Sequence, residues 1–127
     1  MRGGPEARQH RRVVLEAPVQ VYVGSCPDLF LRWCRHLTAT TRNVSATGLL
    51  LYLDHPLAGG AKVCVGIAVE EGGRTQMLKL RGVVVWCRAD AIGESFHAGI
   101  DLCDRPRSAM AIWTRTIYDE IRRQGGG

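Results

Sequence analysis

The sequence of 127 residues is long enough for one domain with its own hydrophobic core and too short for two. Hydrophobic residues make up 46% of it, which excludes a chain that stays disordered as a whole. Apolar runs such as Leu49–Leu53 are far shorter than the roughly 20 residues that a membrane-spanning helix needs. The polar stretch 1–12 precedes no apolar segment of the secretory-signal kind, so we expect a cytoplasmic protein.

The cysteines and histidines show no pattern of ligand spacing. Five cysteines are scattered without a CxxC pair: Cys26, Cys34, Cys64, Cys87 and Cys103. An odd number of separated thiols predicts free cysteines in a reducing compartment rather than a disulfide framework. A zinc site needs thiolates or imidazoles clustered at ligand spacing, so we expect no metal and no cofactor.

The charge is positive and carried almost wholly by arginine. Seventeen basic and twelve acidic residues give a net charge of +5, and every basic residue except Lys62 and Lys79 is an arginine. A guanidinium group matches a phosphate or a guanine edge with two parallel hydrogen bonds, so this surplus favours an anionic partner. A GC-rich genome produces the same arginine bias without any function, and composition alone leaves both explanations open.

Alternating apolar residues, one threonine-rich stretch (Arg35–Thr41) and one apolar run (Gly48–Leu53) predict the strands. Val13–Val23 alternates over its whole length, and Pro18, which lacks an N–H, places this strand at a sheet edge or marks a bulge. Five further strands are expected: Arg35–Thr41, Gly48–Leu53, Lys62–Val69, Met77–Arg88 and Phe96–Leu102. Residues 70–74 contain two glycines and predict a hairpin turn, while Gly82 indicates a bend or bulge in the long strand that follows.

The periodicity changes after the last strand. Four apolar residues recur at spacings of three and four: Met110, Trp113, Ile117 and Ile121. This spacing predicts one face of an amphipathic helix. Asp104 is suited to cap its start, Pro106 fits its first turn, and the glycines from Gly125 onwards end it.

Six strands followed by one helix predict a mainly β fold, a six-stranded antiparallel β-barrel with a C-terminal α-helix. The expected organisation is a flexible basic arm over 1–12, the barrel with its helix over 13–124 and a disordered tail over 125–127. Phe96, Trp86 and Trp113 are interpreted as core residues. Met110 and Trp113 are suited either to pack on the barrel or to form a dimer face, and we expect packing.

The sequence offers no catalytic constellation. It contains no G-x-S-x-G elbow, no Walker loop and no H-E-x-x-H helix. Glu70 and Glu71 lie in a predicted turn, where carboxylates are solvated, and His97 is expected on the outer face of the last strand. We therefore expect a binding protein and not an enzyme.

Two short polar motifs carry the functional prediction. The first is an arginine-rich segment, Arg8-Gln9-His10-Arg11-Arg12, directly before the first strand. The second, Asn43-Val44-Ser45-Ala46-Thr47-Gly48, lies between the second and third predicted strands. A basic arm that ends at a strand can close over an anion on the barrel. The Asn and Ser of the second motif can point the same way, and its glycine permits a positive φ or close approach of a flat ligand.

In this order, on a barrel with a terminal helix, the two motifs resemble those of the PilZ domain family. That family carries RxxxR just before its first strand and [D/N]xSxxG after its second, and here the second motif begins with Asn where Asp is commoner. The resemblance covers nearly the whole chain and implies cyclic diguanylate (c-di-GMP) as the ligand. Five residues match the motifs and are implied to bind it: Arg8, Arg12, Asn43, Ser45 and Gly48.

The resemblance also implies what each motif contributes. The two arginines of RxxxR contact phosphate and guanine, Asn43 and Ser45 contact a guanine edge or a phosphate, and Gly48 provides backbone fit. Arg11 and Arg42 are expected to be auxiliary. We expect the arm to be disordered without ligand and ordered with it, which would relay the signal to a partner protein in motility, polysaccharide or transcription machinery.

Two other functions stay open at this point. A degenerate member of the same family would act as an adaptor through protein contacts without nucleotide, although the intact motif residues argue against it. A small basic barrel is also suited to bind single-stranded nucleic acid by stacking bases on exposed aromatic residues. Aromatic residues make up only 6% of this chain, and Phe96, Trp86 and Trp113 are interpreted as core, which argues against that function.

Overall fold

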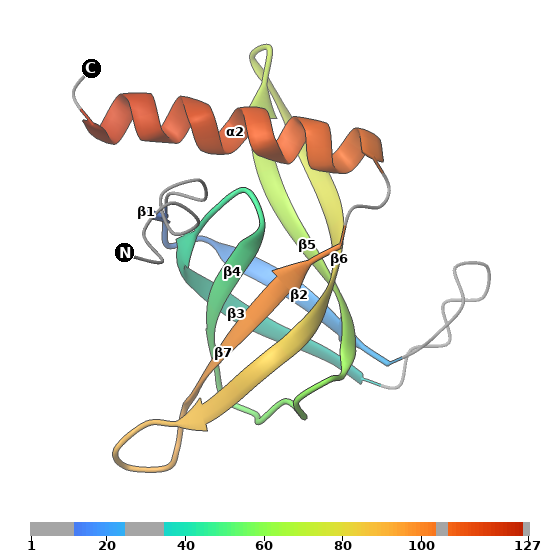
Figure 1. The fold of residues 1–127 in the computed structure, drawn as a ribbon, viewed down its shortest axis with the longest axis vertical. Coiled ribbons are helices and arrows are strands. Elements are labelled where there is room, and N and C mark those ends of the chain that lie inside the picture. Colours follow the sequence, from blue (N-terminus) through green and yellow to red (C-terminus); the bar gives the residue numbers. More distant parts are fainter. Residues whose placement is uncertain (1–11, 25–34, 104–106, 126–127) are drawn as a thin grey trace, which may run out of the picture.

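The structure is a computed structural model that describes residues 12–24, 35–103 and 107–125 (Figure 1). Its elements in chain order are β1 (Val13–Val14), β2 (Pro18–Val23), β3 (Arg35–Val44), β4 (Gly48–Leu53), β5 (Lys62–Glu71), β6 (Arg74–Ala89), β7 (Phe96–Leu102) and α2 (Arg107–Gly125). The mainly β prediction is confirmed. Asp104 and Pro106, expected to begin the helix, lie outside the described residues, as do Cys26 and Cys34.

Six of the strands close into an antiparallel barrel. They pair in the order β3, β2, β5, β6, β7 and β4, and β4 pairs back with β3 to complete the ring. The predicted six-stranded barrel is therefore confirmed. Of the two alternatives predicted for Pro18, the sheet edge is wrong, because β2 lies between β3 and β5. The bulge agrees with the register, because the four steps from Val14 to Pro18 face only three on β3, from Asn43 to Thr40. Pro18 is the first residue of β2, a position where a strand tolerates a residue without an N–H. It directly follows the interruption of the first predicted strand.

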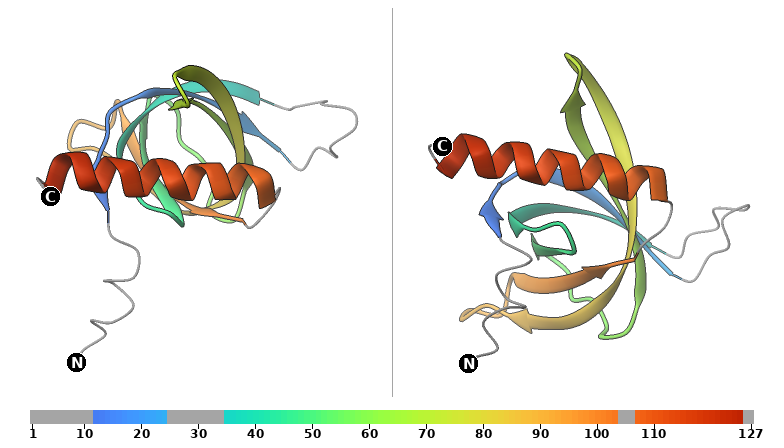
Figure 2. Two further views of the ribbon diagram at one scale, coloured as in Figure 1. Left: turned by 90° about the horizontal axis from the view of Figure 1, so that it is seen from above. Right: turned by 45° about the horizontal axis from the view of Figure 1, so that its top comes forward.

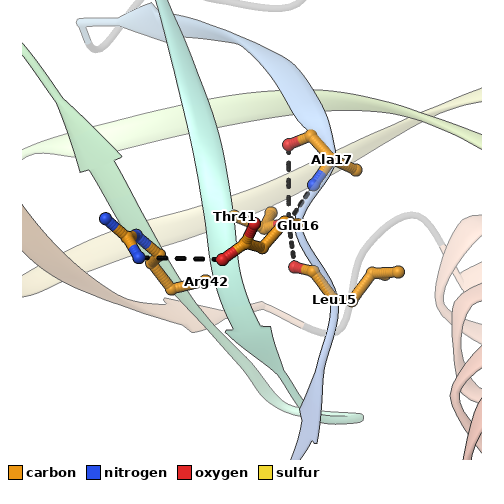
Figure 3. Close-up of polar contacts among 5 residues, drawn as sticks. All are labelled: Leu15, Glu16, Ala17, Thr41 and Arg42. Carbon is orange, nitrogen blue, oxygen red and sulfur yellow. Dashed lines mark hydrogen bonds and ion pairs between the residues drawn. The ribbon is translucent and has the colours of Figure 1, made fainter.

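That interruption, at residues 15–17, is bridged by a buried side chain (Figure 3). Thr41 of β3 has no exposed surface, and its hydroxyl lies between the two chain segments. The Ala17 N–H donates to Thr41 Oγ1 at 2.9 Å, and Thr41 Oγ1 donates to the Leu15 carbonyl at 2.5 Å. The threonine side chain thus satisfies backbone groups that a continuous strand would have paired with β3.

The core fills the barrel and extends to the helix that covers one of its ends. Alternate residues of each strand point inward, such as Val19 and Val21 of β2 and Leu49 and Leu51 of β4. Figure 2 shows α2 lying across the open end of the barrel. Trp113 is fully buried there, and Met110 packs against the same core, so the predicted packing on the barrel is confirmed.

The second half of β6 departs from the predicted alternation of inward and outward side chains. The β6–β7 register shifts between Val84 and Trp86, which is a β-bulge that reverses the direction of the following side chains. Trp86 is consequently 38% exposed, and the interpretation of this residue as core is wrong. A bend or a bulge was expected at Gly82, and the bulge lies later in the strand, between Val84 and Trp86. A Cβ at Gly82 would come within 2.8 Å of the Asp101 carbonyl oxygen, so this glycine permits close approach of β7.

Beyond the helix, β5 and β6 continue as a projecting hairpin (Figure 1). Its turn consists of Gly72 and Gly73, with φ of 61° and 80°, between the paired residues Glu71 and Arg74. Two consecutive positive φ angles are those of a type I′ turn, which suits the twist of a hairpin. The predicted hairpin is confirmed.

Among the described residues, no helix combines the length and apolar character needed to cross a membrane.

Candidate functional site

Strand pairing brings parts of the two sequence motifs into contact. The short strand β1 pairs antiparallel with the end of β3, with Val13 opposite Val44 and Val14 opposite Asn43. Arg12 directly precedes β1, and its Nη1 donates to Asn43 Oδ1 at 3.0 Å. Both side chains lie at the surface, where a bound molecule can reach them. The last residue of the first motif and the first residue of the second are therefore neighbours in space.

A β-bulge in β3 shapes this contact. The β3–β4 register shifts between Thr41 and Asn43, so Arg42 is the additional residue. Because of the extra residue, the side chains of Thr41 and Val44 both point into the core while Arg42 and Asn43 both face outward. Two consecutive polar side chains are thus presented on the outer face of the barrel.

Arg42 is held beside this contact by two neighbours. Its Nη1 lies 3.7 Å from Glu16 Oε2 (Figure 3), and its guanidinium carbon lies 4.5 Å above the centre of the Tyr52 ring. The stacking and the ion pair orient a guanidinium that remains partly exposed. The position agrees with an auxiliary role beside Asn43, and that role stays a prediction.

Ser45 lies in the tight turn that joins β3 to β4, and it is only 2% exposed. Its N–H donates to the Gly48 carbonyl at 2.9 Å, and its hydroxyl accepts from the Thr47 N–H at 3.3 Å. In this structure the Ser45 side chain therefore shapes the turn that follows Asn43. The ligand contact expected of Ser45 stays a prediction.

Gly48 has the extended conformation of a strand residue, the first of β4. A Cβ at this position would lie 3.0 Å from the carbonyl oxygen of Ile100 on β7. The chain approaches Gly48 more closely than almost any Cβ would allow, so the glycine permits tight packing of β4 on β7. The two remaining predicted residues, Arg8 and Arg11, lie outside the described residues.

Three side chains with planar rings lie on the outer face of the neighbouring strands β4, β7 and β6. Tyr52 on β4 is paired with His97 on β7, and their ring centres are 5.0 Å apart. His97 is in turn paired with Arg88 on β6. This outer position of His97 agrees with its prediction, whereas Tyr52 and Arg88 were not predicted as site residues.

Trp86 on β6 is the third of these side chains. A Cβ at Gly99, opposite Trp86, would lie 2.6 Å from the indole Nε1, so the indole lies directly on the backbone of β7. The Arg88 guanidinium carbon lies 5.3 Å from the centre of the Trp86 ring. We call Tyr52, His97 and Trp86 the aromatic row. The exposure of Trp86 was not predicted, because the run Val83-Val84-Val85 does not show at which residue the alternation between inward and outward side chains changes phase.

The site therefore combines guanidinium groups with flat apolar rings on one face of the barrel. Arg12, Arg42 and Arg88 supply positive charge and paired N–H donors, which suit phosphate or the acceptor edge of a purine. Exposed rings such as Trp86 offer surfaces on which a planar base stacks. The arrangement suits a small ligand that carries both phosphate and planar rings.

Comparison with known proteins gives an independent result. The family model described as PilZ domain matches residues 6–110. A comparison with curated proteins finds no match. Among solved structures, the chain is similar to the inhibitor of motility (MotI/DgrA) of Bacillus subtilis, with a TM-score of 0.66 and 20% identity over 94% of this chain. The match covers 52% of that protein, so this chain spans about half its length.

Two isolated PilZ domains are similar over nearly their whole length. The PilZ domain of CeSA from a cellulose-synthesizing bacterium has a TM-score of 0.62 and 17% identity, covering 86% of this chain and 96% of that one. The PilZ domain of YcgR from Escherichia coli, solved with c-di-GMP, has a TM-score of 0.60 and 13% identity, covering 92% and 93%. At such identities the likeness shows a common fold.

Proposed function

This chain belongs to the PilZ domain family, and we propose that it is a receptor for c-di-GMP, which it binds where Arg12 meets Asn43. The observation that carries the proposal is the 3.0 Å hydrogen bond between these side chains, because it joins two motifs that are 31 residues apart. The c-di-GMP bound by the structurally similar YcgR domain supports the choice of ligand.

The chemistry of c-di-GMP fits the residues on this face. Each guanine offers the acceptors O6 and N7 to a guanidinium fork, and the two phosphates offer anionic oxygens. Arg12 and Asn43 supply donors at one end of the face. We propose that the aromatic row supplies a stacking surface for a guanine, with Trp86 as its most exposed ring.

Calorimetric titration with c-di-GMP tests the proposal. We expect Arg12→Ala to weaken binding by about 10-fold or more, since a hydrogen bond to a charged group contributes roughly 1.5–3 kcal/mol. Arg74→Ala removes the same charge from the far hairpin and is expected to change affinity less than about twofold. Equal effects of the two variants, or no heat with the wild-type protein, would contradict the proposal.

The same titration separates the competing functions. A reader of guanine edges prefers c-di-GMP to its adenine counterpart at fixed salt, whereas a binder of single-stranded nucleic acid follows the backbone and tolerates any base. The exposed Trp86 beside Arg88 keeps nucleic acid as the alternative to exclude. An adaptor that acts without nucleotide would release no heat with either dinucleotide.

We further propose that ligand binding orders the N-terminal arm and that a partner protein recognises the ordered arm. The support is that Arg12, the last residue of the arm, contacts Asn43 at the proposed binding position. Saturating c-di-GMP is expected to slow amide exchange over residues 5–14, since their backbone becomes fixed on the barrel. Unchanged exchange in this segment would contradict the relay but not the binding.

A further inference from the structure

The turn that follows Asn43 is held by a residue far away in the sequence. The indole Nε1–H of Trp113 on α2 donates to the main-chain carbonyl of Ser45 at 2.9 Å, across 68 residues of sequence. Trp113 is fully buried and Ser45 is 2% exposed, so solvent does not compete for this bond. The acceptor lies in the turn, and the donor lies in the helix that covers the end of the barrel.

This bond ties the turn to the helix, whereas its other main-chain contacts are to the barrel. The Leu102 N–H at the end of β7 donates to the Thr47 carbonyl at 2.9 Å, and the Ser45 N–H is bonded to Gly48. These contacts are made within the barrel, whereas Trp113 reaches Ser45 from the helix. Without the indole N–H, the buried Ser45 carbonyl would lack this donor and would tend to rotate toward water.

A rotation at Ser45 would be transmitted to the residues proposed to bind ligand. Ser45 follows Val44, which is fully buried and paired with Val13, and these two residues adjoin Asn43 and Arg12 respectively. We infer that Trp113 is a positioning residue for the Asn43–Gly48 turn and thereby sets the affinity for c-di-GMP. This inference rests on the proposed function of that turn.

The expected effect on affinity follows from the fraction of molecules whose turn is in the binding conformation. If only a fraction of molecules keeps the turn in the binding conformation, the apparent dissociation constant rises by the inverse of that fraction. Loss of one neutral hydrogen bond corresponds to roughly 5- to 10-fold, which is the weakening expected when Trp113 cannot donate. Linkage requires the reciprocal effect, in which bound ligand stabilises the docked position of α2.

The test uses two replacements of Trp113 and one control. Trp113→Phe removes the donor together with part of the ring, and replacement of the indole by benzothiophene removes the donor with almost no change of volume. Ile117→Val is the control, because Ile117 is buried on the same helix and loses one methylene without affecting the bond to Ser45. Each protein is titrated with c-di-GMP, and amide exchange at Ser45 and Thr47 is measured without ligand.

We expect both Trp113 replacements to speed exchange at Ser45 and Thr47 and to weaken c-di-GMP binding about 5- to 10-fold. Ile117→Val is expected to change neither beyond about twofold. Wild-type exchange in the benzothiophene protein, or equal effects of Ile117→Val, would overturn the inference. If the wild-type protein binds no c-di-GMP, the proposed function fails, while the exchange comparison still decides whether Trp113 holds the turn.

Discussion

Thr41 shows how one side chain substitutes for a missing piece of sheet. Its hydroxyl contacts the Ala17 N–H and the Leu15 carbonyl, and the gap it bridges separates β1 from β2. Thr41→Val keeps the shape but removes both bonds, so we expect unfolding free energy to fall by about 1–3 kcal/mol in urea denaturation. Thr38→Val, at an exposed position of the same strand, is the control. Equal stability of the two variants would contradict this role.

The absence of a side chain at Gly99 determines where the Trp86 indole lies. A methyl group there would collide with the Trp86 indole, since its carbon would lie 2.6 Å from Nε1. Gly99→Ala is therefore expected to displace the indole, shift tryptophan fluorescence and weaken c-di-GMP binding about 5-fold or more if guanine stacks there. Gly59→Ala is the control, because its new Cβ would approach nothing more closely than 3.9 Å. Unchanged affinity with a displaced indole would remove Trp86 from the proposed site.

The turn of the β5–β6 hairpin shows how much backbone conformation alone contributes to stability. Among the described residues, none beyond the two chain neighbours has an atom within 4 Å of a Cβ built at Gly72 or Gly73, so substitutions there act through the positive φ. We expect Gly73→Val to destabilise the protein by about 1–2 kcal/mol. Gly72→Asn is expected to be neutral or slightly stabilising, because Asn-Gly suits a type I′ turn. Thermal unfolding measures both, and a neutral Gly73→Val would contradict the turn assignment.

All the barrel strands were predictable from the sequence, but the bulges within β3 and β6 were not. The bounds of β4 and β7 agree with their predicted ranges, because the apolar run Gly48–Leu53 and the alternation in Phe96–Leu102 are each uninterrupted. In β3 and β6 an additional residue changes the phase, and the cause lies in pairing with a distant strand. The exposure of Trp86 and the outward pair Arg42 and Asn43 depend on these bulges, so the sequence pattern did not reveal them.

The same difference applies to the candidate site. The motif residues were recognised by type and spacing, because the chemistry of an arginine arm and an Asn-x-Ser turn is local. The contact between Arg12 and Asn43 depends on the pairing of β1 with the end of β3, which continues past the break at residues 15–17. The bond from Trp113 to Ser45 depends on how α2 crosses the barrel. Both contacts join segments whose proximity no local pattern encodes.

At the scale of the whole molecule, the salt dependence of binding separates a dinucleotide receptor from a nucleic-acid binder. The charge of +5 attracts any anion, but only contacts made in the site release counterions. We expect a plot of log affinity for c-di-GMP against log salt to have a slope no steeper than about −3, even if two molecules bind. Titration at several salt concentrations measures it. A much steeper slope together with tight binding of single-stranded oligonucleotides would contradict the assignment.

The joint action of Arg12 and Asn43 on one ligand is tested most directly by a double-mutant cycle. Affinity for c-di-GMP is measured by calorimetry for wild type, Arg12→Ala, Asn43→Ala and the double variant. Because the two side chains are hydrogen-bonded, we expect the double variant to lose less binding free energy than the sum of the single losses, by about 1 kcal/mol. Strictly additive losses, or single variants that bind as tightly as the wild type, would contradict a shared site.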